Sequence, residues 1–179
     1  MPTQQENDET YMGVALLHAK LSKGKRLKVG ACLVLESGVM IGGVNGLPTA
    51  LGNELEYTDS EGNLVSKLEV IHAEQACLNK ATLEGVSTKG AKMYVSHAPC
   101  RHCCSNMIAS GISKIIWKDT YRDTTGLDLL EDAGIVVEQF KEYTMIDSSK
   151  PTLYLIRGVS GAGKSTLAKM LARAVVGYH

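Results

Sequence analysis

Two short motifs constrain this chain of 179 residues more than any other feature: H-x-E at residues 72–74 and P-C-x-x-C at residues 99–103. One imidazole and two thiolates can supply three protein ligands to Zn²⁺ and leave the fourth tetrahedral position for water. The carboxylate of Glu74, two residues after the histidine, can then lie over that water and move protons. We therefore predict a catalytic zinc site whose protein ligands are His72, Cys100 and Cys103.

The same residues allow two other interpretations. A C-x-x-C pair alone is typical of a redox site, but that would leave the H-x-E motif and Pro99 unexplained. A structural zinc needs a fourth ligand, for which His97, His102 and Cys104 are candidates. We expect His102 to point away from its neighbours and Cys104 to be a small buried residue. The remaining cysteines and histidines are expected to be core residues (Cys32 and Cys77) or ordinary helix and loop residues (His18 and His97).

The composition is typical of a globular protein, with 44% hydrophobic and 21% charged residues. The net charge of zero and the single Trp and Phe make long nucleic acid a poor candidate partner, whereas a single nucleotide needs only a few placed groups. Residues 1–10 are polar and acidic, unlike a targeting peptide, and no apolar run approaches the roughly 18 residues that cross a bilayer. Five cysteines without a signal peptide indicate reduced thiols. We expect a cytoplasmic protein that does not bind membranes.

The hydrophobic pattern predicts an α/β fold. The expected elements are a helix from Asn7 or Asp8 to Leu21, a hairpin of strands 29–35 and 39–44, a helix at 71–82, a strand at 92–96, a helix at 100–110, a strand at 113–117, a helix at 125–133 and a strand at 135–140. Residues 47–66 are expected to form a long irregular insertion. This order implies a mixed sheet with helices on both faces. It places all three predicted ligands in the first turns of two helices, where the helix dipole lowers the pKa of a thiol.

Further stretches carry recognisable patterns: R-L-K-V-G-A at 26–31, G-V-N-G-L-P at 43–48, Y-V-S at 94–96, Y-R-D at 121–123, G-L at 126–127 and A-G-I at 133–135. Together with the zinc motifs they resemble the deoxycytidylate (dCMP) deaminases of the cytidine deaminase superfamily. The resemblance covers residues 11–140 and implies a three-layer α/β/α cytidine deaminase-like fold around a five-stranded mixed sheet. Many nucleobase deaminases share the zinc motifs. The G-V-N-G-L-P stretch is what points to a deoxynucleotide monophosphate.

The resemblance implies that the protein converts dCMP and water to dUMP and ammonia, and so supplies dUMP for thymidylate synthesis. Glu74 would take a proton from the zinc-bound water, deliver it to N3 of the base and later protonate the departing amino group. Alternative substrates are other cytosine nucleosides or nucleotides and tRNA.

The resemblance also implies a set of substrate-binding residues. Arg26 would bind the 5′-phosphate, Asn45 the sugar hydroxyl, and Tyr121 would stack on the base with Arg122 beside it; Ala73 belongs to the same site. For Arg26 the alternative is a solvated residue in the basic run 23–28, and for Tyr121 it is plain packing.

Members of the family are activated by dCTP and inhibited by dTTP, and they form hexamers. The resemblance implies an effector site in the G-V-N-G loop, formed by Gly43, Val44, Asn45 and Gly46, with Val44 where the family has Tyr. The alternative is a strand-end turn, which N-G also favours. We expect a homo-oligomer, and Mg²⁺ would accompany a triphosphate effector.

Two departures from the family pattern stand near the H-x-E motif. Ala76 occupies the position of a usual Asn, so no role carries over to it. Many members hold a second, structural zinc before this motif, but residues 47–71 contain no Cys or His. We therefore predict one Zn²⁺ per chain.

A second motif does not belong to a deaminase. Residues 153–157 read as a strand, 158–166 as G-x-x-x-x-G-K-S-T, and 167–176 as an amphipathic helix, which is the setting of a phosphate-binding loop. Lys164 would reach phosphate oxygens and Ser165 would ligate Mg²⁺. The residues that define the motif are Gly158, Gly163, Lys164, Ser165 and Thr166.

We therefore divide the chain into a deaminase-like zinc domain at residues 1–143, a linker at 144–151 and a phosphate-loop fragment at 152–179. The fragment lacks the further strands and acidic residue of a working NTPase, so we expect it to be cut from a bifunctional protein with a P-loop kinase, or to be a remnant tail, and to hydrolyse no ATP. The competing hypothesis for the whole chain is a nucleotide-triphosphate sensor or kinase fragment, in which the deaminase-like domain is a regulatory module. An intact Glu74 favours the enzyme, because a binding module would not need it.

Overall fold

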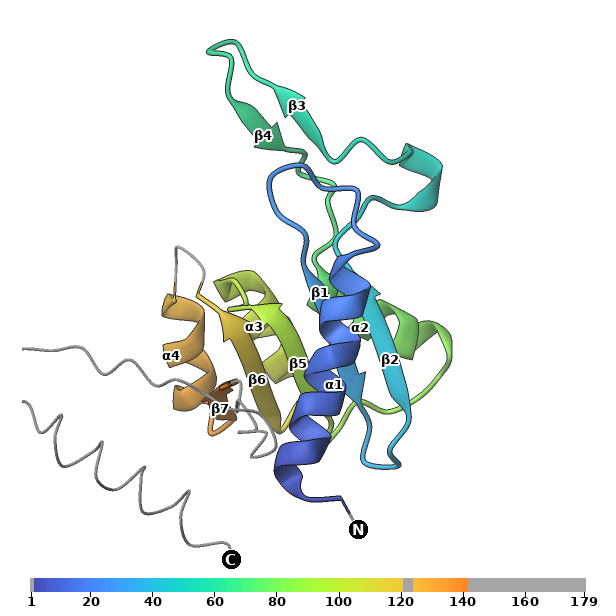
Figure 1. Ribbon diagram of the computed structural model, residues 1–179, viewed down its shortest axis with the longest axis vertical. Helices are drawn as coiled ribbons and strands as arrows, with labels where there is room; N and C mark the ends of the chain where they lie inside the picture. The colour runs from blue at the N-terminus through green and yellow to red at the C-terminus, as the bar shows by residue number, and fades with distance from the viewer. Residues whose placement is uncertain (1, 121–123, 142–179) are drawn as a thin grey trace, which may run out of the picture. The chain divides into compact units, whose positions relative to one another are not determined.

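The computed structural model describes residues 2–120 and 124–141 (Figure 1). Along these residues the elements are α1 (Gln4–Ala19), β1 (Gly30–Val34), β2 (Met40–Val44), a 3₁₀ turn (Thr49–Leu51), β3 (Glu56–Thr58), β4 (Leu64–Ser66), α2 (Ala73–Leu83), β5 (Lys92–His97), α3 (Arg101–Ala109), β6 (Lys114–Asp119), α4 (Thr125–Asp132) and β7 (Val136–Gln139). Tyr121, Arg122, the predicted linker and the phosphate-loop motif lie outside the described residues.

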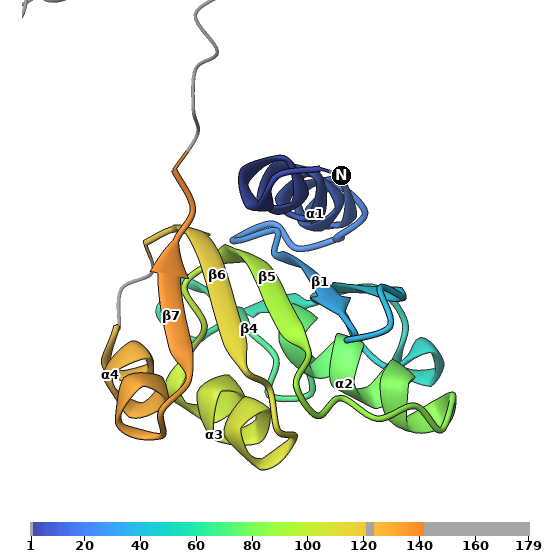
Figure 2. The same ribbon diagram turned by 90° about the horizontal axis from the view of Figure 1, so that it is seen from below.

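The main sheet has five strands in the order β2-β1-β5-β6-β7. The β2–β1 and β1–β5 pairs are antiparallel, whereas β5, β6 and β7 run parallel. Parallel neighbours need a crossover connection, and α3 and α4 supply these between β5 and β6 and between β6 and β7. Helix α1 covers one face of the sheet while α2, α3 and α4 cover the other (Figure 2). The predicted three-layer α/β/α fold with a mixed five-stranded sheet is confirmed.

The interior strand β1 is buried along its whole length because helices cover both of its faces. Ala31 and Leu33 pack into the core on the side of α2 and α3, and Cys32 packs with Met12 of α1 on the other side. Close packing of α1 requires a glycine at position 30, where a Cβ would lie 2.0 Å from the carbonyl oxygen of Ala15. The alternation along β1 therefore builds two cores, one on each side of the sheet. The predicted core positions of Cys32, Cys77 and Cys104 are confirmed.

Helix α1 begins earlier than predicted. Its N-cap is Thr3, whose hydroxyl accepts from the backbone N–H of Glu6, and the carboxylate of Glu6 accepts from the N–H of Thr3 at 2.6 Å. The capping box Thr3-x-x-Glu6 outcompetes the caps expected at Asn7 or Asp8, since it satisfies two N–H groups at once. The side chain of Asp8 instead accepts a 2.6 Å hydrogen bond from the Tyr94 hydroxyl and so anchors α1 to β5.

The prediction of a wholly irregular insertion at residues 47–66 is wrong. The segment contains a 3₁₀ turn and the β3–β4 hairpin, which projects beyond the main sheet (Figure 1). The turn of the hairpin is organised by Asp59, whose Oδ1 accepts from the backbone N–H groups of Glu61 and Asn63 at 2.9 and 2.8 Å. An Asp followed by Gly and Asn is a turn signal, and the hairpin could have been found from it.

None of the helices in the part of the chain that the structure describes is both long and apolar enough to span a membrane.

Candidate active site

The residues of the two zinc motifs meet where α2 and α3 begin. His72 is the N-cap of α2 and Cys100 the N-cap of α3, each in an extended conformation with ψ near 160°. Helix α2 therefore begins two residues later than predicted and α3 one residue later, so only Cys103 of the three ligands lies in a first helical turn. Neither N-cap side chain forms a hydrogen bond that caps its own helix. The imidazole of His72 and the thiol of Cys100 can therefore face each other. Hydrogen bonds of 3.0 and 2.8 Å between the backbones of Gly46 and Ile71 fix the chain just before His72.

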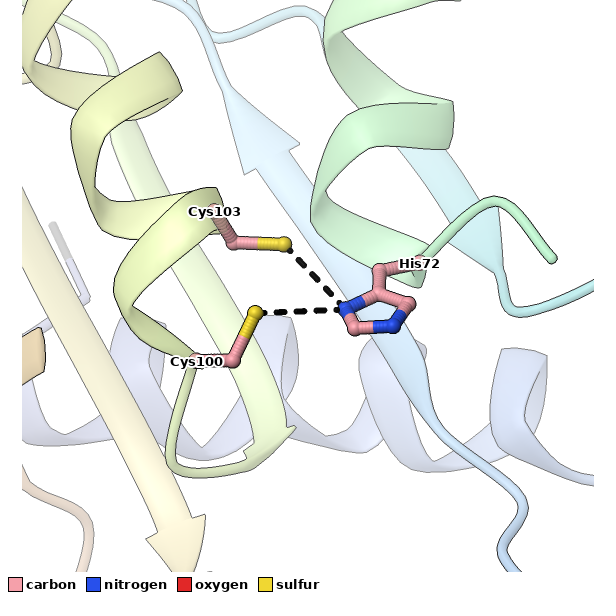
Figure 3. A group of neighbouring side chains, drawn as sticks. All are labelled: His72, Cys100 and Cys103. Atoms are coloured by element: carbon pink, nitrogen blue, oxygen red, sulfur yellow. Dashed lines mark hydrogen bonds between the residues drawn. The ribbon is translucent and has the colours of Figure 1, made fainter. Parts of the chain in front are cut away.

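The three predicted ligands form one cluster, although they come from two helices (Figure 3). Their ligand atoms all lie within 4.8 Å of one another. Nδ1 of His72 is 3.5 Å from the sulfur of Cys100 and 3.4 Å from that of Cys103. A tetrahedral zinc with ordinary Zn–N and Zn–S bonds would separate the nitrogen from each sulfur by about 3.6 Å. The donor set and its spacing therefore fit Zn²⁺ bound through Nδ1 and two thiolates.

The alternative of a structural zinc with four protein ligands finds no support in this cluster. The metal-binding group found among residues 2–120 and 124–141 contains none of the three candidates for a fourth ligand. His102 is exposed and faces Asn106 on the next turn of α3. The thiol of Cys104 is buried and donates to the carbonyl oxygen of Pro99. A zinc held by these three residues alone would keep its fourth position for water, as a catalytic zinc does.

The thiols of the cluster are strongly polarised. Hydrogen bonds from Cys103 and from His72 lower the pKa of Cys100 to about 3. The hydrogen bond to Cys100 and burial raise the pKa of Cys103, and the hydrogen bond with Cys100 raises the pKa of His72. Binding of zinc by both sulfurs therefore requires a proton to leave Cys103, as zinc coordination generally does.

Glu74 lies in the first turn of α2, two residues after His72, and only 3% of it is exposed. Burial raises the pKa of its carboxyl group, and the opposing contributions from its own backbone N–H and from His72 are smaller. A carboxyl group with a raised pKa can both accept and return a proton near neutral pH. Glu74 lies beside the predicted zinc ligands, where the H-x-E spacing predicts the residue that transfers protons.

The cluster opens into a pocket of about 800 Å³, which is within the size range of small-molecule sites. The zinc-motif residues on its wall are His72, Glu74 and Cys100. Two more residues of the predicted site, Arg26 and Asn45, lie on the same wall. The other lining residues were not predicted: Leu27, Val29, Leu55, Glu56, Ser66, Lys67, Leu68, Val70, His97, Ala98, Asp119 and Thr120.

Arg26 is held at the pocket by groups of the hairpin insertion. Its guanidinium donates through Nη1 to the hydroxyl oxygen of Ser66 at 3.2 Å, and its backbone N–H donates to Glu56. Asn45 makes two hydrogen bonds to the backbone of the loop that carries Arg26. Its side-chain oxygen accepts from the N–H of Val29 at 2.8 Å, and its NH₂ donates to the carbonyl of Leu27 at 3.1 Å. Asn45 therefore braces the loop that carries Arg26 while it faces the pocket.

Gly43 of the G-V-N-G loop serves packing in this structure. A Cβ on Gly43 would lie 2.1 Å from the carbonyl oxygen of Ala73 and 2.6 Å from the sulfur of Cys77. Gly43 therefore permits the close approach of β2 to α2. Ala73 is fully buried at the start of that helix, and Val44 is half-buried at the end of β2.

The expectation that His97 is an ordinary loop residue is wrong. It is the last residue of β5 and lines the pocket. Its Nδ1 is 3.0 Å from the hydroxyl of Ser96, and its Nε2 is 4.0 Å from a carboxylate oxygen of Asp119. Burial lowers the pKa of His97, against the opposite effect of Asp119. His97 directly follows a predicted strand and stands three residues before a ligand cysteine, and this position could have indicated that it lies at the pocket.

Comparisons with known proteins agree with this geometry. The family model described as the cytidine and deoxycytidylate deaminase zinc-binding region matches residues 5–118. The chain is 36% identical over 142 residues to the deoxycytidylate deaminase of Mus musculus, which covers 74% of this chain and 78% of that protein. It is 33% identical over 143 residues to the ComE operon protein 2 of Bacillus subtilis, and the match covers 78% of this chain and 74% of that protein. The dCMP deaminase of cyanophage S-TIM5, solved in complex with dCMP and dUMP, superposes with a TM-score of 0.68 at 32% identity over 78% of this chain and 100% of that one.

Proposed function

The chain belongs to the cytidine and deoxycytidylate deaminase family, a family of zinc-dependent hydrolytic deaminases, and we propose that its substrate is dCMP, which it converts to dUMP and ammonia. The observation that carries the proposal is the position of Arg26. Arg26 lies on the wall of the pocket that also contains His72 and Glu74, and its guanidinium is hydrogen-bonded to Ser66 on the same wall. A planar cation with several N–H donors suits a phosphate group, and an unphosphorylated nucleoside would offer it no anionic partner. The similarity to dCMP deaminases of known structure and name supports the same substrate.

We propose that His72, Cys100 and Cys103 hold the zinc and that Glu74 transfers the protons. When bound there, zinc supplies the Lewis acidity that makes water a nucleophile towards C4 of cytosine. Glu74 accepts the proton that the attacking water loses and passes it to N3 of the base. Glu74 then takes the remaining proton from the hydroxyl group now attached to C4 and delivers it to the amino nitrogen, so that the C4–N4 bond breaks, ammonia leaves and C4 becomes a carbonyl carbon. The raised pKa of Glu74, caused by burial, suits a group that must give back each proton it takes.

For the remainder of the nucleotide we propose that Arg26 binds the 5′-phosphate and that Asn45 contacts the sugar hydroxyl. The NH₂ group of Asn45 has two N–H donors, and the structure uses one for Leu27. Ala73 is proposed to border the base. The proposed stacking of Tyr121 on the base, with Arg122 beside it, concerns residues outside the described part of the chain.

Regulation is also proposed, on the family resemblance of the loop formed by Gly43, Val44, Asn45 and Gly46. We propose activation by dCTP, with Mg²⁺ as its counter-ion, inhibition by dTTP, and assembly into hexamers. The division into a zinc domain at residues 1–143, a linker and a phosphate-loop fragment at 152–179 rests on the sequence motif.

The substrate is tested by ammonia release from dCMP, CMP, deoxycytidine and dCTP, each with and without dCTP or dTTP as effector. We expect dCMP to have the highest kcat/KM. Arg26→Ala should reduce kcat/KM for dCMP by roughly one to two orders of magnitude, because a charge-assisted hydrogen-bonded contact is lost, and should leave deoxycytidine unaffected. Exclusive activity on unphosphorylated nucleosides would show that the substrate assignment is wrong.

A further inference from the structure

The residues that hold Arg26 at the pocket have no assigned role. Residues 20–29 connect α1 to β1, and we refer to them as the arginine loop. Near its start, the buried Ser22 donates to the carbonyl of Asn45 at 3.2 Å and accepts from the N–H of Gly24 at 3.1 Å. At its end, the side chain of Asn45 binds Leu27 and Val29. These hydrogen bonds hold the two ends of the loop.

The middle of the arginine loop is held by Glu56 of β3. One oxygen of this carboxylate accepts from the consecutive backbone N–H groups of Lys25 and Arg26, at 3.0 and 3.2 Å. Only 8% of Glu56 is exposed, and these two N–H groups are hydrogen-bond partners of its carboxylate. Consecutive N–H groups that converge on one anion form a typical anion-binding arrangement of the backbone. Here an anion of the protein itself occupies that position, and contact with a ligand phosphate is left to the side chain of Arg26.

The residue paired with Glu56 in the hairpin holds the guanidinium of Arg26. Glu56 of β3 is paired in register with Ser66 of β4, and the Ser66 hydroxyl oxygen accepts from Nη1 of Arg26 at 3.2 Å. The hairpin thus contacts both the backbone and the side chain of Arg26. A guanidinium carries five N–H donors, so one hydrogen bond to Ser66 leaves enough donors for a bidentate contact with a phosphate.

We propose that Glu56 is a positioning residue for phosphate recognition, which fixes the arginine loop so that the guanidinium of Arg26 faces the pocket, with Ser66 setting the direction of the side chain. The β3–β4 hairpin is then a specificity element for nucleoside monophosphates, although it supplies no group to the zinc. The inference rests on the proposed function, since it takes Arg26 as the residue that binds the 5′-phosphate of dCMP.

The test compares dCMP with deoxycytidine, which lacks the phosphate, on the zinc-loaded full chain. We expect Glu56→Ala to raise KM for dCMP about tenfold, the effect of one charge-assisted hydrogen-bonding group, with kcat and the kinetics on deoxycytidine unchanged. Glu56→Gln retains an oxygen that can accept from both N–H groups, so it should recover most of the affinity. Binding of dUMP measured by calorimetry should weaken in parallel. An equal loss on both substrates would mean that Glu56 serves only the fold, and would overturn the proposal.

The chain offers a matched control in Glu54. Glu54 also pairs with Lys25, but through an exposed side-chain contact of 3.3 Å with Nζ, and exposed ion pairs contribute little. Glu54→Gln should therefore leave KM for dCMP unchanged. In the double variant Arg26→Ala/Glu56→Ala, the loss should not exceed that of Arg26→Ala alone, because Glu56 acts through Arg26.

The outcomes separate the inference from the function on which it rests. If Arg26→Ala leaves the preference for dCMP intact, the phosphate assignment itself is wrong. If Arg26→Ala removes the preference while Glu56→Ala retains it, only the positioning role is wrong. Should Glu56→Ala fail to fold, Glu56→Asp, which withdraws the carboxylate from the loop by one methylene, and Ser66→Ala replace it. Both should raise KM for dCMP alone, and an unchanged KM in both would overturn the proposal.

Discussion

Two buried glutamates near the pocket differ in what surrounds their carboxyl groups. Glu74 lies beside the thiols and His72, where burial raises the pKa of its carboxyl group. Glu56 accepts hydrogen bonds from two consecutive backbone N–H groups, which fix the direction of its carboxylate. The first environment suits a group that exchanges protons, and the second suits one that holds a loop in place. The H-x-E spacing identified Glu74 in the sequence, whereas no local pattern marked Glu56, because its partners lie about thirty residues away.

Glu74→Gln separates proton transfer from zinc binding. The substitution retains the shape of the side chain but removes its ability to accept a proton, so we expect kcat for deamination to fall by roughly 10²- to 10⁴-fold with zinc content unchanged. Ammonia release and metal analysis on the same preparation measure the two effects. Glu84→Gln is the control, since Glu84 is exposed at the other end of the same helix. Near-normal turnover of Glu74→Gln would contradict the mechanism.

At the scale of elements, the close approach of β2 to α2 places His72. Gly43 in β2 lies directly against the first turn of the helix, at the carbonyl of Ala73. The Gly-x-Asn-Gly pattern was interpreted from the sequence as an effector loop, and that prediction remains to be tested. The structure adds a packing function that no pattern in β2 alone could reveal, since it depends on a helix about thirty residues further along the chain.

Gly43→Ala tests this packing. The added methyl group would lie 2.1 Å from the carbonyl oxygen of Ala73, so α2 must shift, and we expect a loss of about 1–3 kcal/mol in the free energy of unfolding. Urea denaturation measures it. Gly13→Ala is the matched control: it lies inside α1 with open space around a new Cβ, and alanine there should stabilise the protein by roughly 0.5–1 kcal/mol. Equal stability changes in the two variants would contradict the packing argument.

At the scale of the molecule, the zinc cluster joins two helices that cover the same face of the sheet (Figures 2 and 3). His72 belongs to the start of α2, while both cysteines belong to α3. A metal that binds the folded chain and not the unfolded one stabilises the fold in proportion to its affinity. Zinc is therefore expected to contribute to stability as well as to chemistry.

Removal of zinc by a chelator should lower Tm by roughly 10 °C, which corresponds to about 4 kcal/mol for a site saturated a thousandfold above its Kd. Thermal melts before and after stoichiometric return of zinc measure the shift, and metal analysis should find one Zn²⁺ per chain. His72→Ala should abolish the shift, whereas His102→Ala, an exposed residue between the two cysteines, should retain it. A shift that survives in His72→Ala would place the metal elsewhere.

The sequence by itself determined the order of the main elements, the three-layer architecture and the residues of the zinc motifs. Those features depend on periodicity and on ligand types spaced two or three residues apart, and both are local properties of the chain. The tertiary structure alone decided that His97 lines the same pocket as Arg26 and Asn45, which the family resemblance had already implied for the substrate site. It also decided that the insertion folds back as a hairpin to hold Arg26 through Glu56 and Ser66. Such contacts join residues 30 and 40 positions apart, and their geometry arises from packing, which local sequence patterns do not encode.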